Sequence, residues 1–391
     1  CSWHNFEHDK ITNVINQVIN YGRNGKGIPV VVSAGNDPIG VDPIVNPNVP
    51  YDGNKVLYPA ILEKTIAVGG YTEIQNLGDF NYGEGLDIIA PASAIMTTSY
   101  PWHASQNLYQ NVSGTSLAAP MVTATIALML SVNPELTDEQ IKEILFTYTN
   151  KMPCLYSGDT SYNTTELKEY GTWTWTTGYG ALNTHAAVFE AAFYGNQMII
   201  SGPSEIELCN ETFISISEFD IPEWVDSINW IMGDNVMLIE KISPFSIKVK
   251  AVGVGNAGVS FNIVHKNYTK TIKKSFIVTS SENNIYNYYE FTGVQSISND
   301  ALISGKNIVK PNSTLTISAQ VHCTPNASII VEPGGKLIIN NGVLNSYCSD
   351  FPWKGIVVEG NSNSSQVGFS PNQGSLTMNN GIISNAKIGI M

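Results

Sequence analysis

The chain has 391 residues, which corresponds to two or three domains, and hydrophobic residues make up 43% of it, enough to fill sizeable cores. Its formal net charge is −13, and most of this negative charge lies in residues 1–198. The chain has a single arginine, Arg23, and its lysines are scattered. This distribution excludes the clustered basic face that nucleic-acid binding requires. No run of about 18 apolar residues occurs, so we expect no membrane-spanning segment.

The first residues after Cys1 are typical of the end of a strand before a helix, not of a signal peptide. We therefore expect position 1 to be a cut inside a domain.

The chain has five cysteines: Cys1, Cys154, Cys209, Cys323 and Cys348. Because five is an odd number, at least one cysteine is unpaired within the chain. Cys323 and Cys348 lie in an Asn-rich region. They are expected either to form a disulfide, if the protein is extracellular, or to be two free buried thiols.

Alternating helix and strand patterns predict an α/β layered domain over residues 1–192. Residues 10–22 place apolar side chains at helical spacing and end in glycine. Residues 117–131 are apolar on almost all sides, which predicts a buried helix, and a capping box at 137–140 opens a further helix. Three short apolar runs predict buried parallel strands: residues 28–34, 65–69 and 86–91.

The pattern changes near residue 199 to short strand-like runs separated by Gly and Asn, which predicts a β-sandwich over 199–279. Residues 280–308 are typical of a linker. Residues 335–344 and 374–383 are alike at an offset of 39 residues. This repeat predicts a parallel β-helix over 308–391 with two coils per repeat.

The sharpest chemical signal is the string SGTSLAAP, which places Ser116 at the start of the predicted buried helix. A helix N-terminus offers free N–H groups and a positive end, which stabilise an oxyanion formed when a serine attacks a carbonyl. Gly114 permits close approach of the backbone to a substrate. The alternative is that Ser116 is only an N-cap.

A second signal is the string VVVSAGN, in which Asn36 directly follows a buried strand. Such a position lies at the carboxyl end of the sheet, where α/β folds place their sites. The side-chain NH2 of Asn36 there could donate to an oxyanion. The alternative is an ordinary turn asparagine.

The string GTSLAAPMV, which contains Ser116, resembles the nucleophile motif of the subtilisin family of serine peptidases (subtilases, peptidase family S8), and AGN resembles its oxyanion-hole segment. Ser2-Trp3 resembles the family's substrate-binding strand, although His4 replaces its glycine. Further segments resemble the family in the same order: YPA at 58–60, IAVG at 66–69, IAP at 89–91 and GYGALN at 178–183.

The resemblance covers about residues 1–192 and implies an N-terminally truncated, incomplete doubly wound parallel sheet. It implies a Ser-His-Asp peptidase in which Ser116 is the nucleophile. The N–H of Ser116 and the amide of Asn36 would form the oxyanion hole. Polypeptide substrates would be bound by a set of backbone-contacting residues: Ser2, Trp3, Ala34, Gly35, Gly114 and Thr115, the last of which also supports the oxyanion hole.

The triad histidine and aspartate have no counterpart in these residues. In the family the order is Asp, His, Ser, with the histidine about 150 residues before the serine, whereas Ser116 has only 115 residues before it. No histidine of the chain precedes a glycine, and no Asp-(Ser/Thr)-Gly occurs. We therefore expect both groups upstream of Cys1. The alternative is a catalytically inert homologue that acts as a secreted surface-binding or adhesion protein.

No cofactor is identifiable from the residues. The family resemblance implies calcium, but no loop here shows calcium-ligand spacing. The later segments resemble Ig-like or PKD-like domains and β-helix repeats of secreted proteins of Bacteroidota-like bacteria. This resemblance implies a secreted or cell-surface protein whose C-terminal modules contact cell surfaces or glycans.

Overall fold

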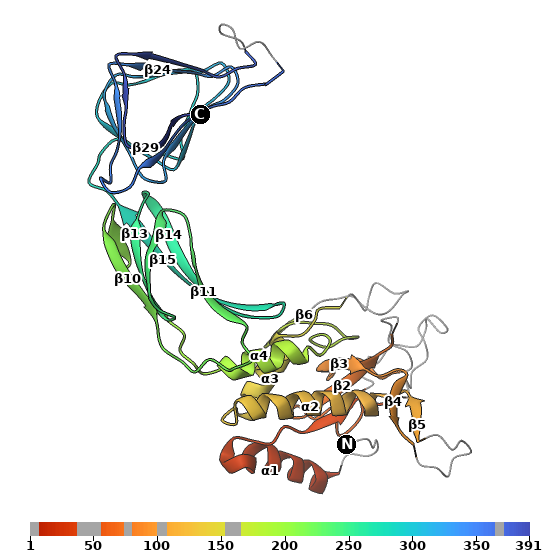
Figure 1. Cartoon of the computed structure of the whole chain (residues 1–391). Coiled ribbons are helices and arrows are strands. Elements are labelled where there is room, and N and C mark those ends of the chain that lie inside the picture. Colours follow the sequence, from red (N-terminus) through yellow and green to blue (C-terminus); the bar gives the residue numbers. More distant parts are fainter. Residues whose placement is uncertain (1–7, 37–55, 74–79, 100–107, 153–165, 364–370) are drawn as a thin grey trace. The chain divides into compact units, whose positions relative to one another are not determined.

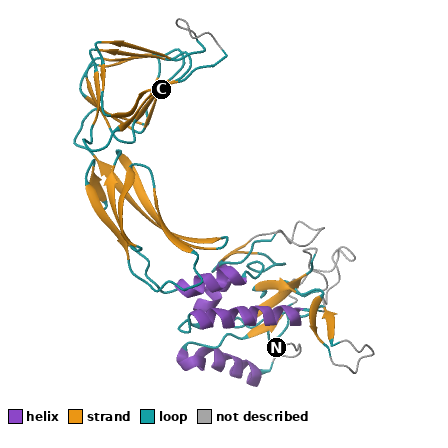
Figure 2. Ribbon diagram, viewed as in Figure 1, coloured by secondary structure: helices purple, strands orange, loops and turns teal. Residues whose placement is uncertain are grey.

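The computed structural model describes residues 8–36, 56–73, 80–99, 108–152, 166–363 and 371–391. The chain divides into two compact units, Cys1–Asn196 and Gln197–Met391. In the first unit helices surround a small sheet, and in the second the described residues form strands and loops (Figures 1 and 2).

The centre of the first unit is a parallel sheet in the order β1-β2-β3. Its strands are β1 (Val31–Ser33), β2 (Ile66–Tyr71) and β3 (Ile88–Pro91). Val32 pairs with Ala67, and Gly69 pairs with Ile89. Strands β1 and β3 lie within their predicted apolar runs, and β2 extends two residues beyond the run 65–69. The prediction of a parallel α/β sheet is confirmed.

The described residues of this unit form four helices: α1 (Asp9–Gly25), α2 (Thr115–Val132), α3 (Asp138–Thr147) and α4 (Thr184–Phe193). The regular turns of α1 stop at Gly22, whose ψ is 159°, so the predicted helix end is confirmed. The predicted capping box of α3 is also present, because the Gln140 N–H donates to Thr137 Oγ1 at 3.2 Å and the Thr137 N–H donates to Gln140 Oε1 at 2.9 Å.

Helix α2 contacts all three strands of the sheet and helix α4 (Figure 1). Its buried side chains include Ala118, Val122 and Met129. The predicted buried helix is buried only in part, because Ala124 is exposed and Leu128 is 49% exposed. Among the described helices, α2 is the one whose length of 18 residues and mean hydropathy of 1.7 would allow it to cross a membrane. Its packing on the sheet is that of a core helix.

Two antiparallel strand pairs are also found among the described residues of the first unit: β4 (Ile95–Thr98) with β5 (Tyr109–Val112), and β6 (Glu166–Lys168) with β7 (Gly171–Trp173). The first pair positions the functional region, since β5 ends shortly before Thr115, the first residue of α2. The chain therefore enters α2 directly from a paired strand.

The second unit begins with two four-stranded sheets, in the orders β12-β13-β10-β8 and β11-β14-β15-β9. They form the predicted β-sandwich, seen as two layers in Figure 1. Alternate residues such as Ile247, Val249, Phe261 and Ile263 are buried. The strands are β8 (Ile200–Ser201), β9 (Glu205–Glu207), β10 (Glu211–Ile216), β11 (Ser227–Met232), β12 (Val236–Ser243), β13 (Ser246–Ala251), β14 (Gly255–His265) and β15 (Tyr268–Thr279).

A parallel β-solenoid follows, with three walls around an apolar core (Figure 2). The walls have the strand orders β16-β19-β22-β25-β28, β17-β20-β23-β26-β29 and β18-β21-β24-β27. Their strands are β16 (Ile285–Asn287), β17 (Glu290–Phe291), β18 (Val294–Ile297), β19 (Ala301–Ser304), β20 (Lys306–Val309), β21 (Thr314–Ile317), β22 (Gln320–Cys323), β23 (Ser328–Val331), β24 (Lys336–Asn340), β25 (Val343–Ser346), β26 (Trp353–Val358), β27 (Ser375–Asn379), β28 (Ile382–Ile383) and β29 (Ala386–Ile390).

Two predictions for this region are wrong. Residues 280–308 are not a linker, because they contain the first strands of the solenoid, β16 to β20. The 39-residue repeat is one coil and not two, since Lys336 pairs directly with Ser375 in the neighbouring coil. The coil between them is long because more residues separate β25 from β26, and β26 from β27, than separate the corresponding strands of the preceding coil.

The cysteine prediction also requires correction. Cys348 forms a disulfide with Cys209 across 139 residues, and Cys323 is a free, buried thiol. By the chain-entropy argument, closing a loop of that length stabilises the folded state by roughly 5 kcal/mol. Cys1 and Cys154 lie outside the described residues.

A buried carboxyl makes the stability of the first unit depend on pH. The residue Asp87 is half-buried, but its carboxyl group is enclosed, and its Oδ2 accepts the Ala67 N–H at 2.7 Å. Burial raises the pKa of Asp87 to about 7, against the lowering effects of that hydrogen bond and of Lys142 and Lys168. The folded state therefore holds a proton that the unfolded state releases above its ordinary pKa of about 4.

We predict that the free energy of unfolding of this unit falls as pH rises from about 4 to about 7. Asp87→Asn keeps an oxygen for the Ala67 N–H and removes the titration, so it should flatten this dependence. Urea denaturation at pH 5 and pH 8 measures the effect, with the exposed Glu84→Gln as control. An unchanged slope in Asp87→Asn would contradict the assignment.

Candidate active site

The N-terminus of α2 is fixed by the chain that leads into it. Gly114 is its N-cap, with φ 151°, and its N–H donates to the carbonyl oxygen of Ala92 at 2.7 Å. The side chain of Ser113 accepts the Ala94 N–H at 3.1 Å. Both bonds tie the start of α2 to the turn after β3, so the helix end has a defined position beside the sheet.

The second part of the site is the chain at the carboxyl end of β1. Ala34 is fully buried, and its N–H donates to Val68 O at 2.9 Å, which extends the sheet pairing by one residue. Gly35 then adopts φ 110°, where a Cβ would also lie 2.4 Å from Asn81 Nδ2. Only glycine fits there without displacement, and the turn that it makes presents Asn36 at the surface.

These two parts meet through Thr115. Its backbone N–H donates to Asn36 Oδ1 at 2.7 Å, and its hydroxyl donates to the same oxygen at 3.0 Å. The hydroxyl oxygen in turn accepts the Gly35 N–H at 3.2 Å. Because a backbone N–H can only donate, the atom facing it must be the amide oxygen of Asn36. The NH2 group of Asn36 is thereby the part of the side chain left to donate elsewhere.

Gly114 lies against this amide. A Cβ added to it would be 3.4 Å from Asn36 Nδ2, and its positive φ is one that other residues rarely adopt. Gly114 thus keeps the space beside the Asn36 NH2 group open.

Ser116 is the second residue of α2 and is half-buried. Within the part of the chain that the structure describes, its side chain forms no hydrogen bond. It follows directly after Thr115, whose contacts fix Asn36, and it lies in the first turn, where the N–H groups of a helix lack intrahelical partners. Ser116 therefore belongs to the helix start that the Thr115 contacts join to Asn36.

The structure therefore brings most of the predicted site residues into one region: Ala34, Gly35, Asn36, Gly114, Thr115 and Ser116. Ser2 and Trp3, predicted to bind substrate, lie outside the described residues. The catalytic and binding roles of all eight residues stay predictions.

Sequence reasoning did not find Asn81. This side chain is 1% exposed, and its Nδ2 donates to Ala34 O at 3.1 Å, while its own N–H donates to Gly35 O at 2.9 Å. It therefore supports the turn that carries Asn36. The available signal was an asparagine between Phe80 and Tyr82, two residues that are also buried.

Comparison with known proteins agrees with this geometry. Residues 2–180 match the model of the subtilase family, Peptidase S8. This region contains the whole candidate site, and the family is one of serine peptidases.

Individual relatives are similar over the same part of the chain. Subtilisin DY of Bacillus licheniformis is 34% identical over 134 residues, which are 34% of this chain and 43% of that protein. An extracellular serine proteinase of Thermus sp. (strain Rt41A) is 34% identical over 124 residues, 31% of this chain and 26% of that protein. The chain thus spans less than half the length of these subtilase relatives.

Solved structures show weaker likeness. A protease from Pseudoalteromonas arctica PAMC 21717 aligns with TM-score 0.34 and 22% identity, over 48% of this chain and 49% of that chain. The PatG macrocyclase in complex with peptide aligns with TM-score 0.35 and 20% identity, over 50% of each chain.

The hydroxyl of Thr115 is predicted to stabilise the site measurably. Thr115→Val keeps the shape but leaves the Gly35 N–H without its acceptor and removes one donor from Asn36. The free energy of unfolding of the first unit should fall by about 1–3 kcal/mol in urea denaturation. Thr115→Ser keeps the hydroxyl and should lose much less. Equal losses in both variants would show that the methyl group, and not the hydrogen bonds, is what matters.

Proposed function

We propose that this protein is a serine endopeptidase in which Ser116 is the nucleophile. The observation that supports it best is the hydrogen-bonded link between Asn36 and Thr115, which holds the amide of Asn36 against the residue that precedes Ser116 at the start of α2. The match of residues 2–180 to the subtilase family supports the same reaction class.

The chemistry follows from the helix end. Attack of the Ser116 hydroxyl on a peptide carbonyl places negative charge on the carbonyl oxygen. The Ser116 N–H and the Asn36 NH2 group would donate to that oxygen, and the positive end of α2 adds to the stabilisation. Thr115 fixes the orientation of Asn36 before substrate binds, so little reorganisation is needed during the reaction.

The hydroxyl of Ser116 also needs a base. None of the described histidines belongs to this site by position: His8 precedes α1, His185 lies on α4, and His265 and His322 belong to the second unit. We assign the histidine and aspartate of the triad to sequence upstream of Cys1. These 391 residues alone are therefore expected to be inactive.

We assign polypeptides as substrates, which would lie along the backbone of Ala34, Gly35 and Gly114.

The disulfide of the second unit supports a secreted or cell-surface location, because disulfides persist in oxidising compartments. Calcium remains an expectation from the family resemblance. Among the described residues no group of three His, Cys, Asp or Glu could hold a metal ion. Contacts with cell surfaces or glycans are assigned to the sandwich and the solenoid.

A second function is a surface-binding protein whose subtilase-like region is inert. The observation in its favour is that no histidine of the chain precedes a glycine and that no Asp-(Ser/Thr)-Gly occurs. The two functions differ in a simple way, since only the peptidase requires a reactive Ser116.

The test uses the protein expressed from its complete reading frame. It should react with a fluorophosphonate probe at Ser116 and cleave an unfolded protein substrate, and Ser116→Ala should abolish both. Asn36→Leu should lower kcat by about 10²- to 10³-fold, a magnitude known from a subtilisin itself. Labelling at another serine, or no labelling in a folded protein, would overturn the proposal and favour the binding function.

A further inference from the structure

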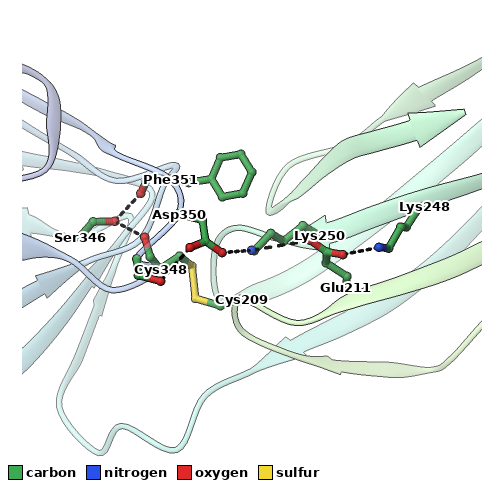
Figure 3. A network of polar contacts seen from close by, with 9 residues as sticks. Cys209, Glu211, Lys248, Lys250, Ser346, Cys348, Asp350 and Phe351 are labelled. Carbon is green, nitrogen blue, oxygen red and sulfur yellow. Dashed lines mark hydrogen bonds and ion pairs between the residues drawn. A yellow bond between two sulfur atoms is a disulfide. The ribbon is translucent and has the colours of Figure 1, made fainter.

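One loop of the solenoid reaches the β-sandwich. We call residues 347–352, which join β25 to β26, the clasp loop. Its Cys348 forms the disulfide with Cys209, which lies just before β10 of the sandwich (Figure 3). The Cys209 N–H donates to Ala251 O at 3.0 Å, so the disulfide is anchored in the sandwich at the end of β13. The clasp loop therefore connects two modules that differ in fold.

Two further residues of the clasp loop complete the environment of a buried lysine. Lys250 of β13 is 5% exposed, and its Nζ lies 3.5 Å from Asp350 Oδ2 and 3.8 Å from Glu211 Oε1 (Figure 3). The ring centroid of Phe351 lies 4.8 Å from the same Nζ. A buried ammonium group requires charge partners and favours an aromatic face. The clasp loop supplies one of each to a lysine of the sandwich.

The clasp loop is also held on the solenoid side. Ser346 Oγ lies 3.0 Å from the carbonyl oxygen of Cys348 and 2.5 Å from that of Phe351. The Tyr347 N–H donates to Cys323 O at 2.8 Å in the neighbouring coil. The loop is thus a fixed extension of the solenoid and not a loose tether.

A second contact region joins the two modules independently of the clasp loop. We call it the seam. The Asn326 N–H donates to Val252 O at 3.2 Å, and the Val254 N–H donates to Ser304 Oγ at 2.9 Å. Between them, a Cβ on Gly253 would lie 2.1 Å from Asn326 Nδ2, so the backbone of the sandwich loop lies directly against the solenoid. These seam contacts are polar hydrogen bonds, which individually contribute little net stability.

We propose that the clasp loop controls the docking of the two modules in a redox-dependent way. When the Cys209–Cys348 disulfide is formed, the clasp loop keeps the sandwich and the solenoid docked along the seam as one rigid body. When the disulfide is reduced, the seam can open. Closing the disulfide keeps the seam groups close together, so each opening of the seam is followed by rapid redocking. Without it, the contacts of Asp350 and Phe351 with Lys250 remain, among the described residues, to hold the clasp loop to the sandwich.

The redox step is an ordinary thiol–disulfide exchange. A dithiol donates two electrons, the bond between the sulfurs of Cys209 and Cys348 breaks, and each sulfur takes up a proton. The dithiol itself becomes a disulfide. The clasp is therefore closed under oxidising conditions outside the cell and opens where thiols are present. This behaviour does not depend on peptidase activity.

Hydrogen exchange of the 391-residue protein tests the proposal. The Asn326 and Val254 amides report the seam directly, and the Leu337 and Phe261 amides report the solenoid and the sandwich themselves. Adding dithiothreitol to the folded protein should speed exchange at the two seam amides by about tenfold or more. Exchange at Leu337 and Phe261 should change much less.

Variants assign the effect to this disulfide. Cys209→Ser combined with Cys348→Ser should show the fast seam exchange without reductant, and dithiothreitol should then have no further effect. Asp350→Asn in the reduced protein should speed seam exchange again, since it removes a partner of Lys250. Unchanged seam exchange on reduction would overturn the proposal. Equal acceleration at Leu337 would also overturn it, because the disulfide would then stabilise the whole solenoid and not the docking.

Discussion

The hydrogen bonds from Thr115 to Asn36 are the interaction on which the candidate site depends. They join the start of α2 to the end of β1, two segments about 80 residues apart in sequence. Each segment is fixed separately, the helix start by Ala92 and the strand end by Val68. The Thr115 contacts thus connect two rigid parts and do not have to order either of them. The amide of Asn36 is therefore held in one orientation by contacts within the protein itself, which is the kind of preorganisation that the proposed oxyanion hole requires.

Much of the fold follows from local sequence. The apolar runs predict β1, β2 and β3, Gly22 predicts the end of α1, and the Thr137–Gln140 capping box predicts the start of α3. In each case the deciding interactions lie within a few residues of one another. The position of Ser116 at the start of α2 follows from the same local reasoning, because Gly114 and the apolar residues after it mark a helix start.

Other features depend on contacts that no local pattern reveals. Only the family resemblance predicts that Asn36 lies near the start of α2, since nothing between the two segments specifies their distance. The hydrogen bonds from Thr115 to Asn36 are a finding of the structure. The Cys209–Cys348 pair could not be found from spacing, because it depends on how the sandwich docks on the solenoid. The sequence of residues 280–308 is typical of a linker because solenoid strands of two to four residues, separated by Gly and Asn turns, show too little alternation to indicate strands. The exposed face of α2 includes apolar residues such as Ala124 and Leu128, so composition alone does not distinguish it from the buried face.

The long fourth coil of the solenoid, β25 to β27, has a consequence for how such a module acquires new properties. Hydrogen bonds between neighbouring coils define the walls. In the preceding coil Thr314 pairs with Lys336, and in the long coil Lys336 pairs with Ser375. The pairing stays in register although the chain between the second pair is much longer. Extra residues can therefore enter at a corner without disturbing the strands on either side. Evolution can vary each corner separately, and the corner after β25 is one where an inserted loop has become an attachment point for a different fold.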